Sequence, residues 1–202
     1  QGSLLAILIV GIYLTLASCC MVYMLSKVMK EKYEKEKFRY TSNTDELTRC
    51  YNRRAYAEDI NKLDLTKEWV YVSMDINGLK NANDSFGHAA GDELIRAAAD
   101  CMKNSFSEHG KVYRVGGDEF AGFAVVENAE QAGQQIYDSI KKAAKVYNET
   151  SDIPYNITLS VGAYTMPCKA GEQIQNYVKF ADQKLYQDKK NKNRVVIKPE
   201  QN

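Results

Sequence analysis

A chain of 202 residues with 45% hydrophobic and 26% charged residues has room for one domain of about 150 residues plus a further segment. Its 3 Pro exclude a collagen-like protein, and its 14 Tyr and 6 Phe exclude a chain disordered by composition. The net charge of +1, from 27 basic and 26 acidic residues, argues against a nucleic-acid partner.

The first segment, residues 2–26, contains no charged residue. As a helix rising about 1.5 Å per residue it is longer than the ~30 Å hydrocarbon core of a bilayer. The sequence therefore predicts a transmembrane helix over residues 1–26. A cleaved signal peptide is the alternative, but its charges would precede the apolar stretch, and here the first charge, Lys27, follows it. Because no Met opens the chain, we expect a fragment that lacks an upstream sensor region.

The flank after this segment sets the expected orientation. Residues 26–40 contain three Glu against six basic side chains, namely Lys27, Lys30, Lys32, Lys35, Lys37 and Arg39. The positive-inside rule keeps such a flank in the cytoplasm, which predicts a single-pass protein of the cytoplasmic (inner) membrane whose later residues are cytoplasmic. The five Cys form no CxxC pair, so neither a disulfide framework nor a zinc site is indicated.

Residues 27–44 are predicted to form a charged helical stalk that ends in a polar hinge at residues 41–44. Met24, Val28, Tyr33 and Phe38 would supply the seam of a parallel two-helix stalk. A solvated helix that only spaces the domain from the membrane explains the same composition.

Residues 45–202 are predicted to form one globular domain. Helices are expected over residues 53–63, 89–106, 129–148 and 171–190, and strands over 69–74, 111–115, 120–126, 157–165 and 194–197. The pair Gly116-Gly117 predicts a two-residue hairpin turn with positive φ. This mixture of helices and hairpins indicates an α+β fold in which helices flank a mostly antiparallel central sheet.

Acidic residues stand at two places where folding alone does not require them. Asp75 ends one apolar strand, and Asp118 and Glu119 follow the glycine turn. Carboxylates that meet at neighbouring strand ends repel one another unless a cation neutralises them, and Mg²⁺ prefers such oxygen ligands. Taken alone, a solvated turn residue is the simpler role for Asp118. The chain contains no GxxxxGK[ST] or GxGxxG phosphate loop.

Residues 114–120 (RVGGDEF) resemble the signature of the GGDEF domain, the diguanylate cyclase family. Four further blocks resemble motifs of this family in the same order. Residues 45–54 resemble DxLTxLxNRR with Cys50 in place of Leu, 75–80 resemble DxDxFK, 83–94 resemble NDxxGHxxGDxxL, and 181–189 resemble ADxALYxAK. The resemblance covers residues 45 to about 197 and implies the palm-like fold of nucleotidyl cyclases.

The resemblance implies an enzyme that condenses two GTP into cyclic di-GMP, with release of two pyrophosphates, across a homodimer interface. By position, Asp75, the Ile76 carbonyl and Asp118 would bind Mg²⁺ or Mn²⁺, and Asp118 and Glu119 would be the catalytic residues. Six further residues would contact the nucleotide and its phosphates, namely Gly78, Leu79, Lys80, Gly116, Gly117 and Lys189.

Guanine recognition maps by the same resemblance onto Asn83 and Asp92. A carboxylate accepts from the N1–H and the exocyclic amine of guanine, and adenine, which lacks those donors, would leave it unpaired. Without the family, an acid near a helix N-terminus is the simpler role for Asp92.

The chain departs from the family pattern at two places. In the family's closing KxxGRN, Lys189 is kept, but Lys192 and Asn193 stand where Gly and Arg belong, and Lys192 or Arg194 would have to substitute. Residues 107–110 (SEHG) replace the RxxD motif, so no inhibitory product site is expected. Two alternatives to an active cyclase remain, a GTP-binding signalling module without turnover and a membrane-tethered dimerisation protein.

Overall fold

The computed structural model describes residues 2–64, 66–106, 110–166 and 173–190. The chain divides into two compact units, Gln1–Asn43 and Thr44–Asn202, here called the N-terminal and the C-terminal unit. Each is described by itself.

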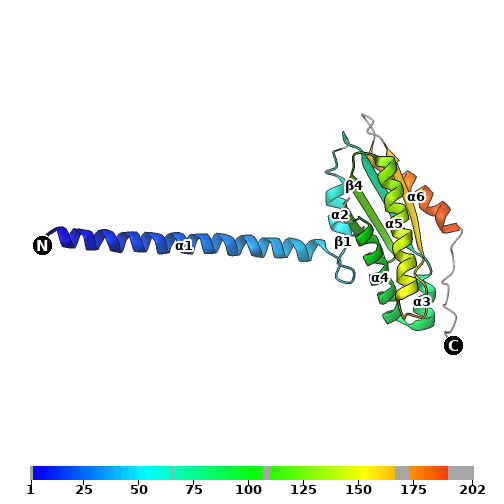
Figure 1. The fold of residues 1–202 in the computed structure, drawn as a ribbon, viewed down its shortest axis with the longest axis horizontal. Coiled ribbons are helices and arrows are strands. Elements are labelled where there is room, and N and C mark those ends of the chain that lie inside the picture. Colours follow the sequence, from blue (N-terminus) through cyan, green and yellow to red (C-terminus); the bar gives the residue numbers. More distant parts are fainter. Residues whose placement is uncertain (1, 65, 107–109, 167–172, 191–202) are drawn as a thin grey trace. The chain divides into compact units, whose positions relative to one another are not determined.

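The N-terminal unit is a single helix, α1, which spans Gly2–Asn43 (Figure 1). It continues through Thr41, Ser42 and Asn43, so the hinge predicted over residues 41–44 is wrong for these three positions. Thr41 Oγ1 donates to the carbonyls of Lys37 and Phe38, which satisfies the hydroxyl inside the helix. In the described part of the chain, α1 is also the one helix long and apolar enough to cross a membrane, a test that signal sequences pass as well.

The C-terminal unit contains a five-stranded sheet in the order β1-β3-β4-β2-β5. The strands are β1 (Tyr51–Asn52), β2 (Trp69–Ile76), β3 (Lys111–Arg114), β4 (Glu119–Val125) and β5 (Leu159–Met166). β1 pairs with β3 in parallel, and the other pairings are antiparallel. The expected α+β fold with a mostly antiparallel sheet is confirmed, and the short parallel pair makes the sheet mixed.

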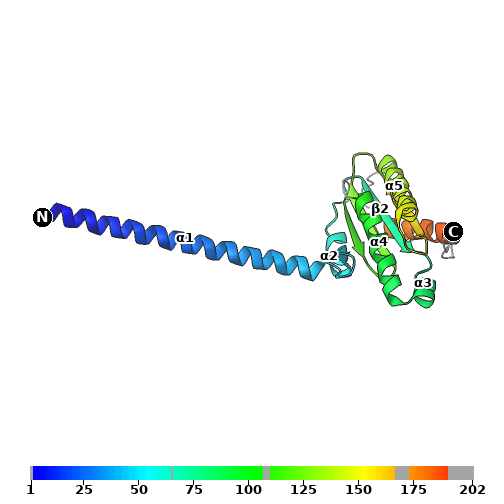
Figure 2. The same ribbon diagram turned by 60° about the horizontal axis from the view of Figure 1, so that its bottom comes forward.

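Five helices of this unit flank the sheet. They are α2 (Arg53–Ile60), α3 (Leu79–Phe86), α4 (His88–Phe106), α5 (Ala129–Thr150) and α6 (Ile174–Lys190). α4 and α5 lie side by side over one face, while α2 and α6 pack on strands from the other side (Figures 1 and 2). The sheet is therefore covered on both faces.

The central strand β2 shows how the two cores divide. All eight of its residues are buried. Val70 and Val72 belong to the core under α4 and α5, whereas Tyr71 belongs to the core under α2 and α6. Because successive side chains of a strand point to opposite faces, Ser73 and Asp75 share the face of Tyr71. A buried strand thus directs a carboxylate towards the α2 and α6 side.

Two local predictions need correction. The strand predicted over residues 69–74 continues to Ile76, so Asp75 lies inside β2 and does not end it. The turn at Gly116-Gly117 has no positive φ, since Gly78 and Gly87 are the glycines with positive φ in the described residues. The turn between β3 and β4 spans residues 115–118 instead.

Other predictions were incomplete or lie outside the described residues. α3 was not expected, and Gly87, with φ 84°, separates it from α4. The expected strand at 194–197 lies outside the described residues, as do residues 107–109, the start of the helix expected from residue 171, and the clamp candidates Lys192, Asn193 and Arg194.

Candidate active site

The pairing of β2 with β4 brings the predicted acidic residues to one end of the sheet. Asp75 lies opposite Glu119 in the antiparallel register. One residue further on, the backbone N–H of Ile76 donates to the Asp118 carbonyl at 3.0 Å. The expected proximity of the Asp75 and Asp118 segments is confirmed, because the turn that carries Asp118 leads directly into the strand beside Asp75.

Asp75 has an unusual environment for a carboxylate. Its residue is only 4% exposed, and Oδ2 accepts a hydrogen bond of 2.8 Å from Lys189 Nζ on α6. Oδ1 is buried without a hydrogen-bond partner among the described residues. Burial raises the pKa of Asp75 above its usual 3.8, the nearby charges of Asp118 and Glu119 raise it further, and Lys189 opposes the rise only in part. The ammonium of Lys189 therefore compensates the Asp75 carboxylate only in part.

The turn supplies two more carboxylates at different depths. Asp118 is half-buried and Glu119 is exposed. A Cβ built on Gly116 would come within 2.7 Å of Glu119 Oε2, whereas a Cβ on the exposed Gly117 would meet no described atom within 4 Å. A side chain at residue 116 would therefore displace the Glu119 carboxylate, and neither glycine is required for a left-handed backbone.

The donor set fits a magnesium-type ion better than a soft metal. In the parts of the chain that are described, no group of three or more His, Cys, Asp or Glu side chains is close enough to hold a metal. Mg²⁺ usually takes only one or two carboxylates and completes its shell with water and substrate phosphates. Asp75, the Ile76 carbonyl and Asp118 offer such an incomplete set, and the unpartnered Asp75 Oδ1 is the observation that favours it.

The segment after β2 resembles an anion site in its backbone geometry. Gly78 has φ 75° and begins α3 without a side-chain cap. Leu79 is half-buried and Lys80 is exposed, so the first amides of α3 lie near the protein surface. Uncapped N–H groups and the helix dipole favour negative charge such as a phosphate. The three predicted phosphate contacts are thus consecutive at one helix N-terminus.

The two guanine candidates lie on adjacent helices. Asn83 is half-buried on α3, and Asp92 is exposed on α4. A Cβ at Gly91 would overlap the Asn83 side-chain amide, so Asn83 lies directly over the residue that precedes Asp92. α4 begins at His88 and has no acid in its first turn, which weakens the helix-dipole role for Asp92.

A pocket of about 410 Å³ opens beside Asp75 and Glu119, between the sheet and helices α2 and α6. Asp75, Glu119 and Lys189 line it together with Ser73, whose hydroxyl donates to Asp182 at 2.6 Å. Sequence reasoning missed this pocket, although Asp182 belongs to the quoted closing motif. A wider groove of about 870 Å³ between α2 and α6 contains none of the predicted site residues.

Comparison with known proteins shows which family this chain belongs to. Residues 42–194 match the family model described as diguanylate cyclase, GGDEF domain. The chain belongs to the GGDEF family. The resemblance carried by the five sequence blocks is therefore confirmed, as is the fold that it implied.

Individual GGDEF proteins are similar over most of this chain. It is 32% identical over 149 residues to the probable diguanylate cyclase DgcI of Escherichia coli, covering 73% of this chain and 31% of DgcI. It is 31% identical over 157 residues to the diguanylate cyclase VdcA of Vibrio cholerae, covering 75% of this chain and 46% of VdcA. The chain thus spans less than half the length of these relatives.

A solved GGDEF structure has the same fold. The coiled coil and GGDEF domain of DgcB from Caulobacter crescentus, in complex with c-di-GMP, superimposes with a TM-score of 0.70 at 23% identity. The match covers 89% of this chain and 97% of the DgcB chain.

Proposed function

We propose that this GGDEF protein is a diguanylate cyclase, which condenses two GTP into cyclic di-GMP with release of two pyrophosphates. One observation carries the proposal: Asp75 is buried with an unpartnered oxygen, opposite the strand that begins with Glu119 of the intact GGDEF signature. A buried carboxylate whose pKa is raised by burial, and further by two neighbouring acids, is costly for folding alone. Such an arrangement is typical of a site that works with a cation.

Asp75, the Ile76 carbonyl and Asp118 would hold Mg²⁺ or Mn²⁺. When bound, the ion supplies neutralisation of the charge on the α-phosphate and on the leaving pyrophosphate. Glu119 is exposed at the same end of the sheet and would accept the proton of the attacking 3′-hydroxyl. Lys189, whose ammonium donates to Asp75 at 2.8 Å, would supply a positive charge for the triphosphate at the same site.

The remaining site residues would orient the substrate. The amides at the start of α3, around Gly78 and Leu79, would bind the β- and γ-phosphates, and Lys80 would add a positive charge beside them. Asn83 and Asp92 would bind guanine edges and reject adenine. Because each chain would hold one GTP, the reaction requires two chains face to face, and we propose a homodimer.

The membrane assignment belongs to the same proposal. Helix α1 would anchor the protein through residues 2–26, and the basic flank after it would keep the C-terminal unit on the cytoplasmic side. The DgcB structure contains a coiled coil together with its GGDEF domain, which supports the proposal of a helical stalk here.

A GTP-binding module without turnover is the second candidate. The observation that favours it is the ion pair between Lys189 and Asp75, since a lysine on a metal-binding carboxylate competes with the metal. Binding of GTP by wild-type protein without formation of cyclic di-GMP, even in an enforced dimer, would select this function.

Turnover by the complete 202-residue chain in phospholipid nanodiscs is the direct test. We expect cyclic di-GMP from GTP and Mg²⁺ by mass spectrometry, and a loss of at least about 10³-fold in Asp118→Ala. The exposed Asp138→Ala on α5 is the matched control and should keep wild-type activity. No product from wild type, or undiminished product from Asp118→Ala, would defeat the proposal.

A further inference from the structure

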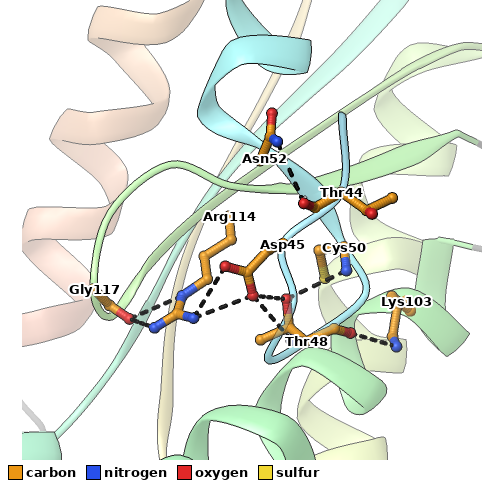
Figure 3. Close-up of polar contacts among 8 residues, drawn as sticks. All are labelled: Thr44, Asp45, Thr48, Cys50, Asn52, Lys103, Arg114 and Gly117. Carbon is orange, nitrogen blue, oxygen red and sulfur yellow. Dashed lines mark hydrogen bonds and ion pairs between the residues drawn. The ribbon is translucent and has the colours of Figure 1, made fainter. Parts of the chain in front are cut away.

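The C-terminal unit begins with a loop, residues 44–50, that is built around one carboxylate (Figure 3). Asp45 Oδ1 accepts hydrogen bonds from Thr48 N at 2.9 Å and Thr48 Oγ1 at 2.7 Å. The Asp45 amide donates to the Cys50 carbonyl at 2.8 Å. Arg49 has φ 59°, the one non-glycine positive φ in the described residues. We call this segment the opening loop, and its own hydrogen bonds fix its shape.

The opening loop is also fixed to the body of the unit. Lys103 Nζ on α4 donates to the Thr48 carbonyl at 2.9 Å, and Asn52 Nδ2 donates to the Thr44 carbonyl at 3.3 Å (Figure 3). Cys50 is only 2% exposed and belongs to the core under α4 and α5. The Cys that replaces Leu in the family motif is thus buried as a small apolar side chain.

Arg114 joins this loop to the turn that carries the candidate catalytic residues. Its Nη1 lies 3.1 and 3.3 Å from the two Asp45 oxygens. Its Nε and Nη2 donate to the Gly117 carbonyl at 3.2 and 2.8 Å (Figure 3). The side chains of Arg114 and Asp45 are 15% and 24% exposed, so the pair is largely shielded from water. A planar guanidinium can hold two acceptors at once, which a lysine ammonium on a flexible stem does far less well.

The bonds to Gly117 act on the peptide that precedes Asp118. Backbone hydrogen bonds also hold this turn, from the N–H groups of Val115 and Gly116 to the Glu119 carbonyl and from the Ile76 N–H to the Asp118 carbonyl. No described atom lies within 4 Å of a Cβ built on Gly117. Arg114 is therefore the side chain that restrains the exposed middle of the turn.

We infer that Arg114 is a positioning residue that holds Asp118 in place through the Gly117 carbonyl and is itself aligned by Asp45 of the opening loop. The catalytic meaning of this inference rests on the proposed cyclase function. Asp45 is the second residue after α1 ends at Asn43. A rearrangement of the opening loop would thus reach the catalytic turn through one side chain. The opening loop, which begins the C-terminal unit, therefore also influences the position of Asp118.

The test uses two variants and one matched control in the complete chain in nanodiscs. Arg114→Lys keeps a cation beside Asp45 but loses the fork that also holds Gly117, and Asp45→Asn removes the charge that aligns the fork. Lys111→Gln is the control, since Lys111 lies on the same strand and pairs with Asp59 at 2.9 Å. Because Asp59 belongs to α2, this pair does not involve the turn at residues 115–118.

Amide hydrogen exchange of residues 115–119 gives a readout independent of activity. We expect exchange in both variants to rise about tenfold in this turn, which opens locally, and kcat to fall about tenfold to a hundredfold with little change in KM for GTP. The slowest amides of the sheet report the stability of the whole unit separately. The control should change neither quantity.

The possible results separate the positioning role of Arg114 from the proposed cyclase function. Unchanged turn exchange in both variants, or an unchanged kcat despite faster turn exchange, would overturn the positioning role. If the variants show faster turn exchange but the wild-type protein makes no cyclic di-GMP, the restraint of the turn by Arg114 is supported and the proposed cyclase function is defeated. If Arg114→Lys does not fold, Asp45→Asn alone carries the same comparison.

Discussion

Asp45 and Asp75 both belong to the C-terminal unit, and each makes an ion pair with one basic side chain. Arg114 lies 3.1 Å from Asp45, and Lys189 lies 2.8 Å from Asp75. The shorter distance belongs to the carboxylate with the raised pKa, and the longer one to the carboxylate with the lowered pKa. The distance to a basic group therefore does not by itself decide whether the pKa of a shielded carboxylate is raised or lowered.

The depth of burial and the number of donors decide it together. Burial alone would raise the pKa of Asp45, but hydrogen bonds from Thr48 and Arg114 outweigh this and hold the pKa below its usual 3.8. Asp75 receives one donor, leaves Oδ1 unpartnered among the described residues, and lies near two further acids. The Asp45 carboxylate is compensated by the fold itself, whereas under the proposed function a bound cation would complete the compensation of Asp75.

The largest expected effect comes from making the same substitution at both places. Asp75→Asn should lower cyclase turnover by at least about 10³-fold, because it removes the negative charge of the proposed metal ligand. In EDTA it should raise the melting temperature, since a poorly compensated buried charge is lost. Asp45→Asn should instead destabilise the unit by about 2 kcal/mol, because charge-assisted hydrogen bonds are lost. Fluorescence of the single Trp, Trp69, reports both transitions from the buried strand β2. A lower melting temperature for Asp75→Asn would contradict the comparison.

A smaller effect should separate the two turn glycines. Gly116→Ala places a methyl group within 2.7 Å of Glu119 Oε2 and should push that carboxylate aside, lowering kcat about tenfold. Gly117→Ala meets no described atom within 4 Å, and neither position has a positive φ, so it should stay close to wild type. Steady-state kinetics of the two variants, with melting curves as a control for folding, measures the difference. Equal losses would mean that crowding at Glu119 is unimportant.

The fold was predictable where local pattern and burial agree. The apolar runs that became β2, β4 and β5 gave the sheet, and their order placed Asp75 near Asp118. α3 was missed because its Asn, Asp and Ser residues are poor helix formers, so that packing of Ala82 and the neighbouring α4 outweighs propensity. The two-residue strand β1 was missed because only its pairing with β3 defines it.

The site was predictable only as far as its motifs. The family resemblance named Asp75, Asp118 and Lys189, but not that Lys189 binds Asp75 across 114 positions of sequence. The pair Arg114 and Asp45 is separated by 69 positions, and no periodicity relates the two. Contacts between side chains that are far apart in sequence depend on the packed sheet and helices, which local pattern does not specify.

A smaller effect again is expected at Lys189, the partner of Asp75. Lys189→Met should lower the melting temperature in EDTA, because Asp75 loses its one donor, and added Mn²⁺ should restore most of the loss. The Lys189 side chain is 41% exposed, so solvent limits the size of this change. The exposed neighbour Lys190→Met is the control. If Mn²⁺ fails to restore the melting temperature of Lys189→Met, the cation does not compensate Asp75.

The smallest expected effect is the acid dependence of stability at Asp45. Because the folded pKa is lowered below the ordinary 3.8, the charged form stabilises the fold above that value, and this contribution is lost as the pH falls through the folded pKa. Urea unfolding followed by Trp69 fluorescence should therefore show a constant difference between wild type and Asp45→Asn from pH 7 to about pH 5. The difference should shrink below about pH 4, as the carboxylate takes up a proton. A difference that persists to the lowest pH would assign the stabilisation to the shape of the opening loop rather than to the charge that aligns Arg114.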